Sequence, residues 1–300
     1  MAKLRVHSMI HYLGVDGGGT STNFKLYNEE GKLVESISLP SIHFMKVNKD
    51  EMIKILTQAN EHFKSKNYTP SNFKIVMGLG GYGANQEIRT VIEYAVYKVF
   101  PQAKLMNDAQ LALVSALSNK NGIFLISGTG SIALRQENGI LTRRGGYGYL
   151  LGDEGSAFWI GKKILERFIK ESDDRLPKTN LTPAVMEYFK ISNPHELIQI
   201  IADKKDIYRE LLAQLSGAMH AIDSIRDIYE NAGMELALLA NSFNPTENTP
   251  LAFGGSVLLK NEVVRSAVLK SLNSNLVFLE SKNDPEYAAF LINQTEIAPE

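Results

Sequence analysis

Apolar and polar residues alternate in short segments at the beginning of the chain, with glycine-rich or polar turns between the segments. This pattern predicts three β-strands in a meander, at residues 10–16, 22–27 and 33–39. A helix is expected next, at about 49–66, because apolar residues recur there at the spacing of one helical face. These residues are Met52, Ile55, Leu56, Ala59 and Phe63. The elements that follow are a strand at 73–77, a helix at 85–99, a short strand ending at Asn107 and a helix opened by Asp108. The predicted order is therefore βββαβαβα.

A similar succession begins again in the second half of the chain. Strands are expected at 122–126, 132–136 and 140–143, and the turns between them resemble those of the first half in composition and spacing. Further helices are expected between about 154 and 241, then a strand at 250–253, a helix, a strand at 275–279 and a last helix from about 285. A duplicated α/β fold is the simplest explanation of this repetition.

The composition narrows the possible functions. The chain has 300 residues, of which 44% are hydrophobic, so it can bury a large core as one or two domains. Its 32 basic and 33 acidic residues nearly balance, which gives no electrostatic reason to expect nucleic acid or an anionic membrane as a partner. The chain has no cysteine, which excludes disulfides, thiolate zinc sites and cysteine nucleophiles, and we expect a cytoplasmic protein.

The length of the apolar runs and the first residues of the chain also bear on localisation. No apolar run approaches the roughly 20 residues that are needed to span a bilayer. Residues 1–11 lack the apolar core and the cleavage site of a signal peptide. We expect them to form a short extension ahead of the first strand.

The first turn of the meander carries candidate chemistry for binding phosphate. A glycine hairpin at Gly17, Gly18 and Gly19 exposes backbone N–H groups on one side, and glycine lets phosphate oxygens approach them closely. Asp16, at the end of the strand, is a candidate for holding Mg²⁺, and Thr20 is a candidate for a hydrogen bond to phosphate. Taken alone, the turn is equally compatible with a glycine hairpin that binds nothing.

The second half repeats this chemistry at the matching place. Its turn consists of Ser127, Gly128, Thr129, Gly130 and Ser131. Two such turns that face each other would hold a polyphosphate from both sides. The pair favours phosphate binding more strongly than either turn does alone.

Asp108 is the candidate catalytic residue. It follows the strand that ends at Asn107 and opens a helix, where aspartate is common simply as an N-cap. A carboxylate at a strand end is also suited to accept the proton of an attacking hydroxyl group. Phosphoryl transfer needs little more than one positioned base, Mg²⁺ and backbone donors. The two roles are compatible.

Two more glycine-rich segments are candidates for ligand binding. Segment 145–156 contains Tyr147, Gly148 and Asp153, and it is compatible with one wall of a site for a small polar ligand. Asp153 is equally compatible with an N-cap of the helix that follows. Gly254 and Gly255 open a helix after an apolar strand, where a flat nucleotide has room against the backbone or where the chain simply turns.

A competing interpretation comes from Gly78, Gly80 and Gly83, which form G-x-G-x-x-G between a strand and a helix. This is the fingerprint of dinucleotide-binding oxidoreductases. However, it does not follow the first strand, and it leaves both hairpin turns and the Asp153 segment unexplained. The chain has no P-loop motif, and its six histidines show no metal-ligand spacing.

These motifs, in this order, resemble those of the N-acetylglucosamine kinase branch of the actin/hexokinase/Hsp70 superfamily, within the BadF/BadG/BcrA/BcrD ATPase family. The resemblance runs from about Leu13 to Ile292. Its strongest segments are 14–20, 107–109, 126–131, 152–157 and 254–257. It implies an α/β fold of two ribonuclease-H-like (actin-like ATPase) domains with the active site in a cleft between them. The domains would be 1–112 and 113–284, the second with a helical insertion, and a C-terminal helix at about 285–300 would pack back on the first.

The resemblance also implies an activity. It is the transfer of the γ-phosphoryl group of MgATP to a hydroxyl, expected to be O6, of an amino sugar such as N-acetylglucosamine. Asp108 would be the catalytic base and a sugar ligand, and Asp16 would serve Mg²⁺. The residues implied at the sugar are Tyr147, Gly148 and Asp153, and those at ATP are Gly17, Gly18, Gly19, Thr20, Gly128, Thr129, Gly130, Gly254 and Gly255. The family commonly works as a dimer, so we expect a homodimer.

Two positions depart from the pattern of the family, both on the sugar side. Relatives usually have an asparagine as a sugar ligand where this chain has Ile42, and the animal enzymes have a tryptophan where it has Tyr147. The alternatives are therefore a kinase for another sugar, such as glucosamine, N-acetylmannosamine or glucose, or a non-catalytic sugar- and ATP-binding regulator. The family also contains activator ATPases that hold an iron–sulfur cluster through cysteines, and the absence of cysteine argues against that function.

Overall fold

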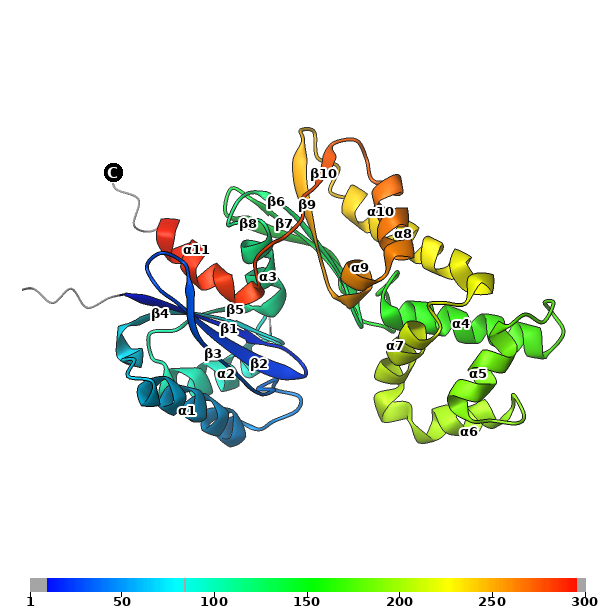
Figure 1. The fold of residues 1–300 in the computed structure, drawn as a ribbon, viewed down its shortest axis with the longest axis horizontal. Helices are drawn as coiled ribbons and strands as arrows, with labels where there is room; N and C mark the ends of the chain where they lie inside the picture. The colour runs from blue at the N-terminus through cyan, green and yellow to red at the C-terminus, as the bar shows by residue number, and fades with distance from the viewer. Residues whose placement is uncertain (1–9, 84, 296–300) are drawn as a thin grey trace, which may run out of the picture. The chain divides into compact units, whose positions relative to one another are not determined.

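The computed structural model describes residues 10–83 and 85–295, and their contacts divide the chain into two units (Figure 1). Unit 1 is formed by the residues up to Lys120 together with those from Ser281 onward, and unit 2 by Asn121–Glu280. The domain limits expected from the sequence remain a prediction. The expected extension lies largely outside the described residues, and so do the last five residues, 296–300, of the expected final helix.

Unit 1 contains a five-stranded sheet in the order β3-β2-β1-β4-β5. Its strands are β1 (His11–Gly17), β2 (Ser21–Tyr27), β3 (Leu33–Pro40), β4 (Phe73–Leu79) and β5 (Lys104–Asn107). The central strand, β1, pairs antiparallel with β2 and parallel with β4. Its middle residues are buried because helices cover both faces of the sheet.

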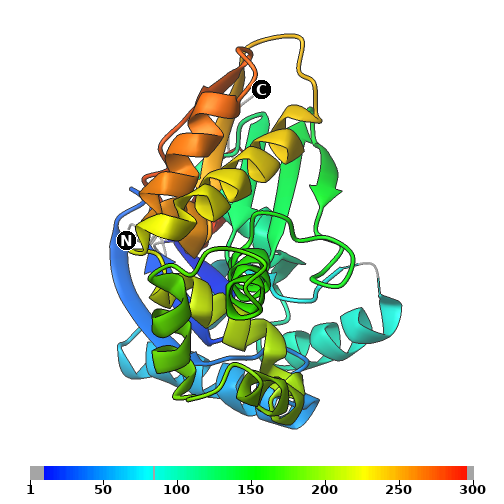
Figure 2. The same cartoon turned by 90° about the vertical axis from the view of Figure 1, so that its right-hand side faces the viewer.

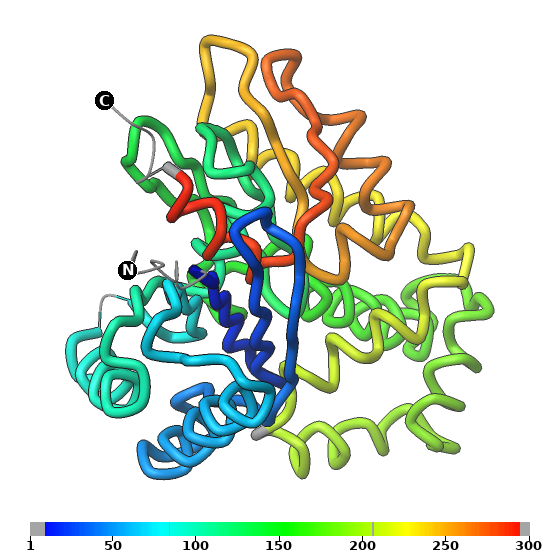
Figure 3. The backbone as a smooth tube through the Cα atoms, turned by 60° about the vertical axis from the view of Figure 1, so that its left-hand side comes forward, coloured from blue at the N-terminus to red at the C-terminus, as the bar shows by residue number. Residues whose placement is uncertain are grey.

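Different helices cover the two faces of this sheet (Figure 1). The helices α1 (Lys49–Ser65) and α2 (Gln86–Val99) pack on one face, and the predicted apolar face of α1 is buried there with Leu13 and Val15 of β1. On the other face lie α3 (Asp108–Ala116), the short η4 (Pro285–Tyr287) and α11 (Ala288–Thr295). Figure 3 shows this last helix, in red, beside the first strands, in blue. One further turn of helix, η1 (Pro70–Asn72), precedes β4.

Unit 2 contains a second five-stranded sheet, in the order β10-β9-β6-β7-β8. Its strands are β6 (Gly122–Ser127), β7 (Ser131–Glu137), β8 (Ile140–Gly145), β9 (Thr249–Gly254) and β10 (Leu276–Phe278). The central strand, β6, again pairs antiparallel with the next strand and parallel with a later one, β9. The two sheets share one topology, which confirms the predicted duplication.

The helices of unit 2 enclose a core of its own. They are α4 (Ala157–Ser172), α5 (Leu181–Phe189), α6 (Glu196–Asp203), α7 (Tyr208–Ala218), α8 (Arg226–Asn241), α9 (Ser256–Lys260) and α10 (Glu262–Ser271), with the short η2 (Lys205–Ile207) and η3 (Asp223–Ile225). Figure 2 shows α8 and α10 side by side. Among the described residues, no helix has both the length and the apolar character that a membrane crossing requires.

Two helix caps that the sequence suggested are wrong. Asn107, not Asp108, caps α3, and its side chain accepts the N–H of Ala109. Ser156, not Asp153, caps α4, and its hydroxyl accepts the N–H of Trp159. Both caps are residues of the preferred type, so two suitable residues compete at each helix start and the backbone conformation selects between them.

Candidate active site

The parallel strands of unit 1 bring two carboxyl groups to one edge of the sheet. Gly17, at the end of β1, is in register with Leu79 of β4, and Leu79 is in register with Asn107 of β5. Asp16 and Asp108 therefore lie at the same sheet edge. Measured across the strands, their backbones are about two strand spacings, or roughly 10 Å, apart. Asp16 points to the face that η4 covers, because the backbone of Glu286 packs against Gly14, two residues earlier in β1.

Burial and neighbouring charges keep the Asp16 carboxyl from ionising easily. Burial raises its pKa to about 7, helped by the negative charges of Glu286 and Asp108, while Lys25 acts in the opposite direction. A cation bound beside such a group would favour its charged form. Within 10–83 and 85–295, no three His, Asp or Glu side chains form a group that could hold a metal ion. One or two carboxylates are nevertheless enough for Mg²⁺ when phosphate oxygens and water complete its coordination, so the residues at this edge fit that ion.

The glycine turn of unit 1 is tied to the segment that follows β3. The N–H of Gly18 donates to the carbonyl of Ser21 and closes the turn. A Cβ added at Gly18 would come no closer than 3.6 Å to any other group, and one at Gly19 would meet nothing within 4 Å, so the turn has open space beside it. The hydroxyl of Ser41 donates to the carbonyl of Gly18 at 2.7 Å and accepts the N–H of His43 at 3.1 Å. These bonds hold the turn and the Ser41 segment together.

His43 is a candidate site residue that the sequence did not indicate by itself. Its neighbour Ile42 is only 3% exposed and belongs to the core, where it packs near Gly17. His43 is half-buried, and burial lowers its pKa although the charge of Asp108 raises it. Its Nδ1 accepts the N–H of Met45 at 3.3 Å, so the neutral ring carries its proton on Nε2. The only signal in the sequence was its position next to Ile42.

Packing around the same edge explains two of the three glycines of the G-x-G-x-x-G motif, Gly78 and Gly80. A Cβ at Gly80 would lie 2.7 Å from the ring of His43, and one at Gly81, where φ is +84°, would lie 2.2 Å from the ring of Phe44. A Cβ at Gly78 would lie 2.4 Å from Leu111 of α3. The glycines at 78 and 80 therefore allow side chains of unit 1 to approach the backbone closely. This packing accounts for them without a dinucleotide.

In unit 2, the second glycine turn contacts the segment that precedes α4. The hydroxyl of Ser127 donates to the carbonyl of Gly155 at 2.9 Å, and that of Ser131 donates to the carbonyl of Glu154 at 2.7 Å. The carbonyl of Gly128 accepts the N–H of Ala157 at 2.8 Å. The structure thus brings together two of the segments that the sequence singled out.

Gly255 brings the third of these segments to the same turn. Its φ is +82°, and a Cβ there would lie 2.3 Å from the carbonyl oxygen of Ser127. A Cβ on the preceding Gly254 would lie 2.4 Å from the ring of Phe124. The strand-to-helix turn at Gly255 therefore rests directly on the backbone of the second glycine turn.

Gly255→Ala is expected to destabilise the protein through this close contact. Gly139→Ala is the matched control, because Gly139 has φ of +79° but nothing within 4 Å of an added Cβ. The control should lose roughly 1–2 kcal/mol for the left-handed backbone, and Gly255→Ala roughly 1–3 kcal/mol more for the overlap. Urea unfolding of both variants measures the difference, and equal losses would contradict the steric explanation.

Asp153 is buried rather than exposed on a loop. Its side chain is 4% exposed, its φ is +63°, and its carboxyl accepts the N–H groups of Ser131 and Gly148. Burial raises its pKa, although these hydrogen bonds and the charge of Arg209 act in the opposite direction. The guanidinium of Arg209 lies 3.5 Å from it. Tyr147, by contrast, is 69% exposed, with the guanidinium of Arg143 5.7 Å from the centre of its ring.

A cavity of about 280 Å³ lies beside the Gly255 turn. Residues from α7 and α9 line it, with contributions from the start of α4. The lining includes Ala213, Ser216 and Gly217 of α7, Ser256 and Val257 of α9, and Ala157 of α4. The sequence did not indicate the α7 residues, because small residues in a helix carry no signal of a cavity.

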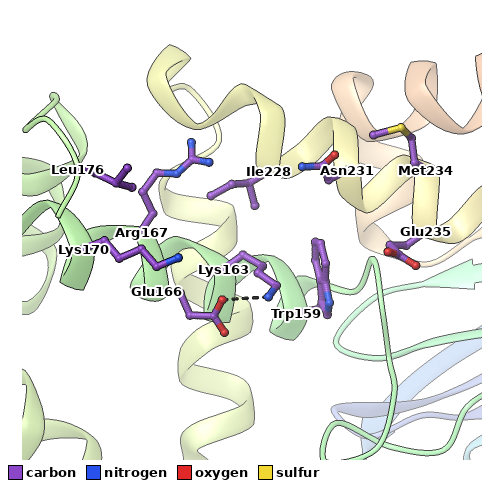
Figure 4. Close-up of a pocket in the computed structure, with 10 residues that line it drawn as sticks. All are labelled: Trp159, Lys163, Glu166, Arg167, Lys170, Leu176, Ile228, Asn231, Met234 and Glu235. Atoms are coloured by element: carbon purple, nitrogen blue, oxygen red, sulfur yellow. Dashed lines mark hydrogen bonds and ion pairs between the residues drawn. The ribbon is translucent and has the colours of Figure 1, made fainter.

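A larger cavity, of about 560 Å³, lies elsewhere in unit 2, between α4 and α8 (Figure 4). The ammonium group of Lys163 pairs there with Glu166 at 2.9 Å and lies 5.6 Å from the centre of the Trp159 ring. None of the residues that the sequence singled out lines this cavity. Size alone therefore does not identify the site.

Two curated relatives match almost the whole chain. An N-acetylmuramic acid/N-acetylglucosamine kinase of Clostridium acetobutylicum is 26% identical over 305 residues, which cover 96% of this chain and 99% of the relative. An N-acetyl-D-glucosamine kinase of Dictyostelium discoideum is 27% identical over 308 residues, which cover 94% and 97%.

The fold and the family are also known from comparison. A solved structure from Chromobacterium violaceum, described as that of a candidate N-acetylglucosamine kinase, superimposes with a TM-score of 0.74 at 22% identity, covering 94% of this chain and 98% of that one. The likeness confirms the predicted fold. The model of the BadF/BadG/BcrA/BcrD ATPase family matches residues 13–290. The resemblance inferred from the motifs is therefore confirmed, and the chain belongs to the BadF/BadG/BcrA/BcrD ATPase family.

Proposed function

We propose that this protein is an ATP-dependent sugar kinase, which transfers the γ-phosphoryl group of MgATP to the O6 hydroxyl of an amino sugar such as N-acetylglucosamine. One observation carries the proposal: Asp108 lies at the same sheet edge as Asp16, in a chain whose relatives over nearly their full length are named sugar kinases. The match to an ATPase family supports ATP as the phosphoryl donor.

Asp108 acts as the base in this proposal. It accepts the proton of the sugar hydroxyl as the hydroxyl oxygen bonds to the γ-phosphorus and the bond to ADP breaks. One oxygen of Asp108 accepts the N–H of Ala109 at 2.8 Å, which holds the carboxyl group at the start of α3. Bound Mg²⁺, for which Asp16 is the proposed ligand, neutralises charge on the phosphates.

Unit 2 supplies the adenosine and phosphate contacts in this proposal. The cavity beside Gly254 and Gly255 is the proposed place of adenosine, and it adjoins the turn of Gly128, Thr129 and Gly130. The turn of Gly17 to Thr20 in unit 1 is also proposed to bind phosphate, because it has open space beside its backbone.

The sugar side differs from the expectation at Ile42. Because Ile42 is buried in the core, it makes no contact with a sugar in this proposal. His43 supplies the hydrogen bond instead, through the proton on Nε2, since it lies near enough to Asp108 to respond to its charge. Tyr147, Gly148 and Asp153 remain proposed sugar residues, of which Asp153 acts by holding the turn and the loop together.

A coupled assay of ADP release over a sugar panel tests the function. The panel contains N-acetylglucosamine, N-acetylmuramic acid, N-acetylmannosamine, glucosamine and glucose, each with and without Mg²⁺. We expect turnover that depends on an amino sugar and on Mg²⁺, with the product phosphorylated at O6 by NMR. Sugar binding without turnover would identify a regulator, and ADP release that no sugar stimulates would contradict a sugar kinase.

We also propose that the protein is a homodimer and is cytoplasmic. Light scattering would test the dimer, and cell fractionation would test the localisation.

A further inference from the structure

Arg209 is a charged residue that none of the motifs predicted, and it lies against the second glycine turn. A Cβ added at Gly130 would come within 2.6 Å of both Nη2 of Arg209 and Oδ2 of Asp153. Only glycine fits at this position while the guanidinium occupies that place. The side chain of Arg209 is partly buried, at 38% exposure.

Most of the N–H donors of the Arg209 side chain have no hydrogen-bond partner among the described residues. Its contact with Asp153 is a single one, at the long distance of 3.5 Å. Its Nε is buried, and within the described residues it has no hydrogen-bond partner. A guanidinium has five N–H donors in a planar fork that suits two oxygens of a phosphate or carboxylate. A buried donor without a partner costs free energy and calls for an explanation.

Pairing with Asp153 does not provide that explanation. The carboxyl of Asp153 already accepts the N–H groups of Ser131 and Gly148, and burial raises its pKa in spite of the arginine. Other arginines of unit 2 show what a structural pair looks like here. Arg167 contacts both oxygens of Asp227 and also donates to the carbonyl of Ser224 at 3.0 Å.

The helix that carries Arg209 also lines the proposed adenosine cavity. Ala213, Ser216 and Gly217 follow Arg209 by four, seven and eight residues, which places all of them on one face of α7. From Arg209 to Ser216 the helix rises by about 10 Å, which is comparable to the distance from the base of a nucleotide to its phosphates. One face of α7 thus runs from the cavity to the glycine turn.

We propose that Arg209 binds a phosphate of the nucleotide at the turn of Gly128 to Gly130, through the donors that Asp153 leaves free. The inference rests on the proposed function, because it names ATP as the ligand. It adds a positive side chain to a turn whose other proposed contacts are backbone N–H groups. Charge on the phosphates increases the strength of such contacts, and arginine suits them better than lysine does.

The test compares nucleotide binding to the wild type and to Arg209→Ala, Arg209→Gln and Arg209→Lys by titration calorimetry. We expect Arg209→Ala to weaken the binding of ATP by at least about 10²-fold. The affinity for adenosine should not change, since adenosine has no phosphate. Arg209→Lys should restore part of the affinity, and Arg209→Gln none. Arg226→Ala is the matched control, because Arg226 forms an exposed ion pair with Glu230 on α8, and it should bind both ligands normally.

Several outcomes of the binding and kinetic measurements would overturn the inference. Equal loss for ATP and adenosine would indicate a structural role of Arg209, and unchanged ATP affinity would show that the phosphates do not meet it. A raised KM for sugar with a normal KM for ATP would make Arg209 a positioning residue for Asp153. If the wild type binds ATP through Arg209 but phosphorylates no sugar, only the proposed function fails; if it binds no adenine nucleotide, both fail.

Discussion

Asp108→Asn is expected to lower the turnover of the sugar kinase reaction by about 10²–10⁴-fold or more, the contribution typical of a general base. Asparagine has nearly the same shape, and its carbonyl oxygen can still accept the N–H of Ala109 at the start of α3. The variant therefore removes proton acceptance while the local fold is kept. Steady-state kinetics with the preferred sugar measures the loss.

Two controls separate this effect from misfolding. ATP affinity of Asp108→Asn should stay close to that of the wild type, because the proposed adenosine and phosphate contacts of unit 2 are unchanged. Asp50→Asn changes an exposed carboxylate in the first turn of another helix of unit 1, and its turnover should be normal. Near-normal turnover of Asp108→Asn would remove Asp108 from the mechanism.

Asp16→Asn is expected to lower turnover strongly and yet to stabilise the ligand-free protein above pH 7. Burial, Glu286 and Asp108 raise the pKa of Asp16 from its usual 3.8 to about 7 in the folded state. Between these two pH values the folded protein keeps a proton that the unfolded chain releases. The folded state therefore binds more protons, and the free energy of unfolding falls as pH rises through this window. The full difference corresponds to about 4 kcal/mol.

Urea unfolding at pH 4 and pH 8, without nucleotide or divalent cations, measures this effect. Asparagine carries no charge at either pH, so the variant should exceed the wild type in stability at pH 8 and lose most of that advantage at pH 4. Turnover should fall by about 10²-fold or more, because the phosphates lose a fixed Mg²⁺ contact. If the variant were no more stable than the wild type at pH 8, Asp16 would not be a buried carboxylate under strain from its neighbours.

Asp227 provides a control of opposite sign. Its hydrogen bond to Arg167 lowers its pKa in the folded state. Its contribution to stability is present above the unfolded pKa and is lost as pH falls through the folded one. Asp227→Asn should therefore destabilise the protein at pH 8 and have less effect at low pH, the reverse of Asp16→Asn.

The prediction for Asp16 separates its effect on the stability of the free protein from its proposed role in catalysis. A carboxylate held among other carboxylates destabilises the free protein. The proposed cation would stabilise its charged form only when MgATP binds. Arg209 has the same character in unit 2, since its buried Nε has no hydrogen-bond partner among the described residues and its proposed ligand is a phosphate. Unfavourable interactions of this kind are common at functional sites.

The elements of both sheets followed from periodicity, because alternation and helical spacing reflect burial within a few neighbouring residues. The buried face of α1 is the one predicted from Met52 to Phe63. The repeated turns predicted the duplication, and the motifs together predicted the family. The helix caps were not predictable in the same way. Adjacent or nearby residues of equal capping propensity differ only in their backbone angles, as Asp153 with φ of +63° and the true cap Ser156 show.

Local pattern therefore specified the strands, the glycine turns and the candidate carboxylates of this protein, since these depend on residues close together in the chain. It could not specify which distant segments meet. Glu286 reaches Asp16, and Arg209 reaches Gly130, through the pairing of strands and the packing of helices that lie far apart in sequence. The charge of Asp16 and the use of Arg209 depend on these contacts, because burial and neighbouring charges are set by the folded environment and not by the residue itself.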